Sequence, residues 1–82
     1  MARRGMSEAD KHARAVQAAR RMVSAGERPA YRLRVLPYGS WAVDGLPGVV
    51  VAAPSLRDAP AAARAVIAVV LEVRPDAFDV ET

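Results

Sequence analysis

The chain contains no cysteine and a single histidine, His12. Disulfide bonds and thiolate metal ligands are therefore excluded, and one imidazole is too few for most zinc sites. No hydrophobic run approaches the roughly 20 residues that span a bilayer, and no apolar leader segment follows Arg3 and Arg4. We expect one small domain, residues 1–82, in the cytoplasm, with no metal, cofactor or membrane contact. A chain this short buries only about 60% of its unfolded surface, which favours oligomers.

Positive charge is concentrated in the first part of the chain. Residues 1–34 hold nine basic and three acidic side chains, whereas residues 35–82 hold three basic and six acidic ones. The usage of Ala, Val, Arg and Pro is high and typical of a GC-rich bacterial genome. The cations of the N-terminal arm and of one face of the helix after it are Arg3, Arg4, Lys11, Arg14 and Arg21. Such a cluster is able to bind the phosphates of DNA or RNA, or an acidic partner, but it is also compatible with a solvated surface.

The first predicted element is a helix over residues 7–26, preceded by a basic arm, residues 1–6, that we expect to be flexible. Ser7 is a typical N-cap, acidic residues follow in the first turn, and Gly26 comes after the last turn. The apolar face of this helix is narrow, carries small side chains and includes His12. The helix should therefore pack against another element, either in its own chain or in a neighbouring subunit.

A β-hairpin is predicted next. Tyr31, Leu33 and Val35 alternate with arginines, which indicates a half-buried strand with these three side chains inward. Pro37 ends this strand, and a turn over residues 38–40 leads to a second short strand that contains Trp41. Trp41 is expected either to cover the edge of the core or to anchor a partner.

A second turn and a third strand complete the predicted sheet. Leu46-Pro47-Gly48 is a compact reversal, because proline presets φ and glycine adopts conformations that other residues avoid. Residues 49–53 are apolar on both faces of the expected strand. This pattern predicts a strand that is covered on both faces or lies centrally in the sheet.

The second predicted helix has a start that the sequence leaves open. If Ser55 is the cap, Pro60 lies inside the helix and removes a hydrogen bond, whereas with Asp58 as the cap Pro60 falls harmlessly in the first turn. The side of this helix that should face the core carries Leu56, Ala59, Ala63, Val66, Ile67 and Val70.

The outer side of the same helix is also apolar, with Ala61, Ala65, Ala68 and Val69. A helix that is apolar all round is usually buried all round. These four residues, together with Trp41, are therefore the candidate interface with a second copy or with a partner protein. An alanine-rich composition alone would also produce this pattern.

The predicted fold class is α+β with the order α-β-β-β-α. A three-stranded antiparallel sheet is packed by the C-terminal helix, and an extra helix precedes the sheet. Residues 77–81 alternate well enough for a short fourth strand, or for a tail that pairs only in an oligomer.

The stretch from Tyr31 to Val73 resembles the HicB family of antitoxins, which have a partial ribonuclease-H fold. The segments that carry the resemblance are the strand Tyr31–Leu36, the strand entry Gly39–Val43, Asp44–Val49 with its Leu-Pro-Gly, and the helix start Ser55–Ala59. The resemblance implies an α/β sandwich, a homodimer and a small protein partner that is toxin-like. The chain departs from the family where Ala53-Pro54 replaces the usual glycine before the cap.

No arrangement of catalytic residues emerges from the sequence. No serine is spaced to pair with His12, and Asp76, Asp79 and Glu81 are more simply a solvated tail than an ion site. We therefore predict a non-catalytic module, antitoxin-like or an accessory regulator, that forms a homodimer and binds another protein. The alternative is a DNA- or RNA-binding accessory protein. Double-stranded-RNA-binding domains share the α-β-β-β-α order, but Arg57 beside Asp58 stands where they present lysines.

Overall fold

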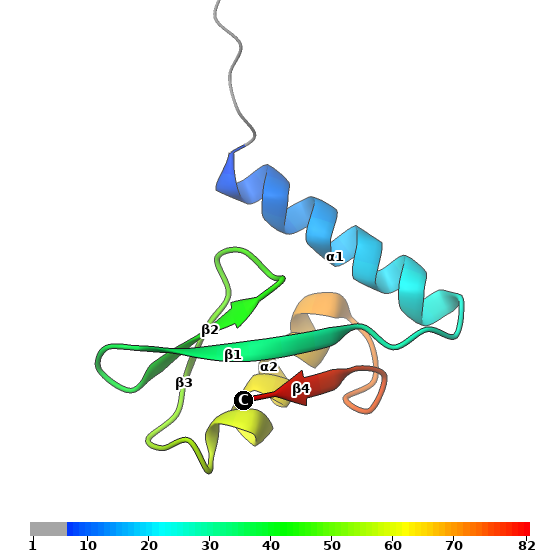
Figure 1. Cartoon of the computed structure of the whole chain (residues 1–82). Helices are drawn as coiled ribbons and strands as arrows, with labels where there is room; N and C mark the ends of the chain where they lie inside the picture. The colour runs from blue at the N-terminus through cyan, green and yellow to red at the C-terminus, as the bar shows by residue number, and fades with distance from the viewer. Residues whose placement is uncertain (1–6) are drawn as a thin grey trace, which may run out of the picture.

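The structure, a computed structural model of the chain, describes residues 7–82, so the expected flexible arm lies outside the described residues. The element order is α-β-β-β-α-β, and the fold is α+β as predicted. The elements are α1 (Glu8–Ser24), β1 (Ala30–Leu36), β2 (Ser40–Asp44), β3 (Val50–Ala52), α2 (Ala59–Leu71) and β4 (Asp79–Glu81). In Figure 1, α2 lies behind the sheet and α1 runs along one end of it.

The strands form one mixed sheet in the order β3-β2-β1-β4. The three strands predicted from the sequence pair antiparallel, β1 with β2 and β2 with β3. The C-terminal segment adds a fourth strand within the same chain, parallel to β1. This direction follows from the connection, because α2 crosses one face of the sheet and returns the chain to the opposite edge.

One face of the sheet is buried and the other is open. On the buried face Leu33 lies opposite Val43, and Trp41 lies opposite Val51. These side chains pack with α2 in a single core that also contains Tyr31, Leu46, Val49, Ala53, Ala59, Ala63, Ile67, Leu71 and Phe78. On the open face Arg34 pairs with Asp44 and Arg32 with Glu81, at 3.2 and 3.6 Å.

Both helices begin as their local sequences favour. The Ser7 Oγ accepts a hydrogen bond from the Asp10 amide at 3.1 Å, which confirms the predicted cap of α1. For α2 the cap is Asp58, so Pro60 lies in the first turn and the alternative with Ser55 as cap is wrong. Ser55 instead accepts from the Asp58 amide at 3.3 Å. The N-terminal helix packs against α2 of its own chain, with Ala19 buried between the elements.

Three packing predictions are wrong. Val35 is 66% exposed, because it lies beside the hairpin turn and beyond the part of β1 that pairs with β4. Leu56 is exposed because it precedes the first turn of α2 and so is not on the helix face expected to pack. The third strand is at an edge of the sheet, not central, and Val50 and Ala52 on its open face are exposed.

Candidate functional site: an apolar face on the second helix

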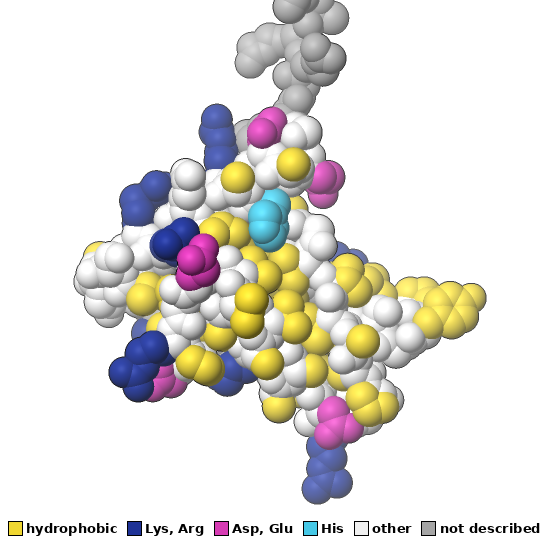
Figure 2. Space-filling view, turned by 180° about the vertical axis from the view of Figure 1, so that it is seen from behind, with side chains coloured by type: hydrophobic (Ala, Val, Ile, Leu, Met, Phe, Trp, Pro, Cys, Tyr) yellow, Lys and Arg dark blue, Asp and Glu magenta, His cyan; other side chains and the backbone are white. Residues whose placement is uncertain are grey.

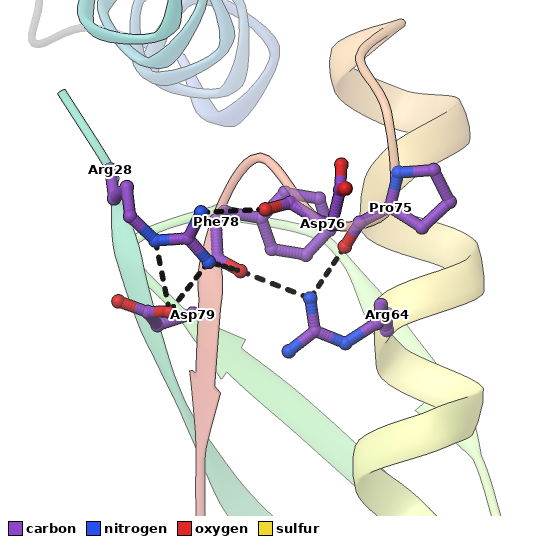
Figure 3. A network of polar contacts seen from close by, with 6 residues as sticks. All are labelled: Arg28, Arg64, Pro75, Asp76, Phe78 and Asp79. Atoms are coloured by element: carbon purple, nitrogen blue, oxygen red, sulfur yellow. Dashed lines mark hydrogen bonds and ion pairs between the residues drawn. The ribbon is translucent and has the colours of Figure 1, made fainter. Parts of the chain in front are cut away.

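The helix α2 carries a single charged residue, Arg64, in its 13 positions. The guanidinium of Arg64 folds back toward the C-terminal segment, where it donates to the carbonyl oxygens of Pro75 and Phe78. It also lies 5.2 Å from the centroid of the Phe78 ring, a cation–π distance. Figure 3 shows that this side chain reaches across to β4. The surface that α2 presents to solvent on its other side is therefore without charge.

The outer face of α2 consists of Ala61, Ala65 and Val69, which lie one helical turn apart. All three are exposed, and Val69 is 76% exposed. The half-buried side chains that flank this face are Ala62, Val66 and Val70, so it continues as an apolar surface toward the core. Figure 2, seen from the α2 side, shows hydrophobic side chains gathered across the middle of this surface. An apolar surface with polar margins is typical of a site that contacts another macromolecule.

Two of the residues expected at this interface are elsewhere. Ala68 is 8% exposed and belongs to the buried core cluster, so it is not part of the exposed outer face. Trp41 is 9% exposed, and its indole N–H donates to the Ala53 carbonyl at 3.3 Å. Trp41 therefore covers the core, the first of its two expected roles. Ala61, Ala65 and Val69 are the residues that the fold brings together.

A polar network beside this helix joins Arg28, in the segment before β1, to the segment that leads into β4. Arg28 donates to the carbonyl oxygens of Asp76 and Phe78, at 2.6 and 3.1 Å, and to the Asp79 carboxylate at 2.8 Å. In Figure 3, Arg28 and Arg64 converge on the Phe78 carbonyl from opposite sides. The hydrogen bond from Arg28 lowers the pKa of the Asp79 carboxyl. This network holds β4 in place.

The carboxylates near the C-terminus are used as ion-pair partners. Asp79 pairs with Arg28, Glu81 with Arg32 and Asp76 with Arg74. Within residues 7–82, no three His, Asp or Glu side chains come together in a group that could hold a metal ion. These three carboxylates therefore form solvent-exposed ion pairs with arginines.

The basic residues of α1 form a second exposed surface. Lys11, Arg14 and Arg21 are exposed, and their spacing places them on the side of α1 opposite its packed face. Lys11 lies 3.8 Å from Glu8, while neither Arg14 nor Arg21 has an ion-pair partner among the residues that the structure describes. Arg3 and Arg4, the other two predicted cations, lie outside the described residues.

His12 has a structural contact. Its Nδ1 lies 3.0 Å from the Pro47 carbonyl oxygen, and since a carbonyl only accepts, Nδ1 is the donor. This bond ties α1 to the turn between β2 and β3. His12 is half-buried on the packed side of α1 and makes no hydrogen bond to a serine hydroxyl within the described part of the chain.

The comparisons with known proteins add no relative. A scan against protein-family models, a search of curated proteins and a search of solved structures each found no match. Over residues 7–82, neither helix has the length and apolar character needed to cross a membrane. The apolar face of α2 was detectable in the sequence, because only one charge interrupts residues 59–71. The exposed Val50 was not, because alternation does not show which strand ends a sheet.

Proposed function

We propose that this chain is a small non-catalytic bacterial module, similar to the HicB antitoxins, that forms a homodimer and binds another protein in the cytoplasm. The observation that carries the proposal is the charge-free outer face of α2, with Ala61, Ala65 and Val69 exposed. Complete burial of a side chain such as valine contributes about 1.5–3 kcal/mol. Since Val69 is 76% exposed, covering it by a partner contributes about 1–2 kcal/mol.

The resemblance of residues 31–73 to HicB antitoxins supports the same proposal, because those antitoxins act by binding a small protein. In this reading the chain is an antitoxin or an accessory regulator. The four-stranded sheet with α2 on one face is compatible with that fold. The outer face of α2 is then the surface that contacts the partner.

The test compares Val69→Glu with the wild-type chain. A carboxylate placed in an apolar interface without a partner costs several kcal/mol. The dissociation constant of the complex formed through the outer face of α2 should therefore rise about 100-fold or more. The measurements are sedimentation velocity of the purified protein and retention of a stoichiometric protein on co-purification from the organism that encodes it.

Ala13→Glu is the matched control, since it adds the same charge at an exposed position of α1. It should leave both association and circular dichroism unchanged. Val69→Glu should remain folded as well, because its side chain points to solvent in the single chain. If wild type and Val69→Glu have the same sedimentation coefficient and retain the same proteins, the proposal is refuted.

A second candidate function is phosphate binding by α1. Six other cations have ion-pair partners, namely Lys11, Arg20, Arg28, Arg32, Arg34 and Arg74. The exposed Arg14 and Arg21 have none within residues 7–82, which concentrates uncompensated charge on α1. This favours DNA or RNA binding through the phosphates, without recognition of sequence.

The phosphate-binding candidate is tested by the salt dependence of binding. Replacing Arg14 and Arg21 together by alanine should weaken binding of any duplex and reduce the slope of log K against log salt by about 2. The control replaces Arg32 and Arg34, which have carboxylate partners on the sheet, and should have a smaller effect. Absence of duplex and RNA retention at low salt in a filter-binding assay would eliminate this candidate.

A further inference from the structure

The two edges of the sheet differ in charge. The β4 edge carries Asp79 and Glu81, both in ion pairs with arginines. The β3 edge carries no charge, and no charged residue occurs between Asp44 and Arg57. Proteins commonly protect sheet edges with charged side chains, prolines or a covering element, because an unprotected edge is a template for another strand. The shortness of β3 is its main protection.

The backbone of β3 presents unused hydrogen-bonding groups along this edge. Val43 donates to the Val49 carbonyl at 3.3 Å, and Ala53 donates to the Gly39 carbonyl at 2.9 Å. In an antiparallel ladder alternate residues face the neighbouring strand, so the N–H and C=O groups of Val50 and Ala52 point away from β2. Within residues 7–82, β3 is an edge strand that pairs with β2 alone, so these groups face no neighbouring strand.

We propose that β3 pairs antiparallel with β3 of a second copy, which joins the two four-stranded sheets into one continuous sheet. With Val51 on the twofold axis, Val50 lies opposite the partner's Ala52, and the two exchange both of their backbone hydrogen bonds. The axis repeats this exchange on its other side. No like charges meet, because the segment is neutral.

A second copy suits this edge better than an unrelated strand. A twofold axis through β3 closes the assembly at two chains, whereas pairing of β3 with β4 of the next copy would continue without end. Three paired residues bury too little surface for a stable dimer, which needs about 1,200 Å² or more. Ala62 and Val66 lie on the side of α2 opposite Arg64, which is the side nearer β3, and both are half-buried. They extend the interface.

This inference rests on the proposed homodimer, and it assigns the second copy to β3. The outer face of α2 then remains for a different protein. The two surfaces adjoin at Ala62 and Val66. They can still be tested separately by mutation, because Val50 and Ala52 lie on the open face of the sheet, whereas Val69 lies on the solvent side of the helix that packs on the opposite face.

The decisive variant is Ala52→Pro in the full chain. Proline removes the Ala52 N–H, which β2 does not use, and its ring obstructs approach to the edge. The expected result is a fall of the sedimentation coefficient to that of an 8.7 kDa monomer. Ala52→Val, which keeps the N–H and favours strands, is the control and should remain dimeric. Trp41 fluorescence reports whether β2 and β3 still pair, because its indole binds the Ala53 carbonyl.

Amide hydrogen exchange of wild type gives a second measurement that does not depend on the proline variant folding. Protection of the Val50 and Ala52 amides should increase with protein concentration as the dimer forms. A wild-type monomer, a dimeric and folded Ala52→Pro, or rapid exchange of both amides in the dimer would each overturn the inference. If Val69→Glu dissociates the dimer and Ala52→Pro does not, the edge pairing is wrong while the proposed function stands.

Discussion

Phe78 should contribute more to stability than any other residue of the C-terminal segment. Its side chain is fully buried, and its ring meets Tyr31 edge to face, with centroids 6.2 Å apart and an interplanar angle of 71°. Arg64 lies over the same ring. Replacement of a buried phenylalanine by alanine costs about 3–5 kcal/mol. The whole domain is worth only about 4–12 kcal/mol at its length of 82 residues. Phe78→Ala should therefore lose about a quarter or more of the free energy of unfolding.

Phe78→Leu separates the aromatic contacts from burial. Leucine keeps most of the apolar volume but loses the edge contact with Tyr31, worth about 0.5–1.5 kcal/mol. It also loses the cation–π contact with Arg64, worth about 0.5–1 kcal/mol. We expect a cost of about 1–3 kcal/mol, below that of Phe78→Ala. Combining Phe78→Leu with Arg64→Ala should cost less than the sum of the two, because both remove the same contact.

The assay is urea unfolding at equilibrium, followed by Trp41 fluorescence and by circular dichroism. Leu56→Ala is the control, because Leu56 is exposed and precedes α2, and it should change the free energy of unfolding by less than about 0.5 kcal/mol. A cost for Phe78→Ala below about 1 kcal/mol would refute the reasoning. It would mean that the segment leading to β4 does not pack on the sheet.

Three further predictions concern local contacts and pH. Gly45 has φ +102°, and a Cβ there would lie 3.2 Å from Tyr31 Cδ1, so Gly45→Ala should cost about 1–3 kcal/mol in urea unfolding. Gly48→Ala meets only open space and should cost less. Burial raises the pKa of Tyr31 above 10.0, so the folded state holds this proton more tightly and stability should fall as pH rises past about 10. Tyrosinate absorbance of the Tyr38→Phe variant measures Tyr31 alone, and ionisation below pH 10 would contradict this. The hydrogen bond from Arg28 lowers the pKa of Asp79 below 3.8. The contribution of the Arg28–Asp79 contact to the free energy of unfolding is therefore present above that pH and lost as the pH falls below it. Below about pH 4, the urea midpoint of Asp79→Asn should decrease less steeply with falling pH than that of wild type. An equal decrease in the two proteins would count against the contact between Arg28 and Asp79.

The strands and helices could be predicted from the sequence because their signals are local. Ser7 caps α1 through a bond to a residue three positions on, and the alternation in β1 and β2 shows which side chains share a face. The apolar outer side of α2 also follows from spacing alone. The sequence left the cap of α2 open between Ser55 and Asp58. The structure has Asp58 as the cap, which places Pro60 in the first turn, where proline costs no hydrogen bond.

The sequence by itself therefore determined the elements, their order and the three antiparallel strands. Only the tertiary structure decided which apolar side chains are covered. Ala68 is buried in the core although its spacing places it beside the outer residues of α2, and Val50 is exposed because no strand lies beyond β3 within the described residues. Arg64 leaves the outer face of α2 because its partners are carbonyl groups 11 and 14 residues further along the chain. Such contacts join residues distant in sequence, and the periodicity of one segment carries no information about what packs against it.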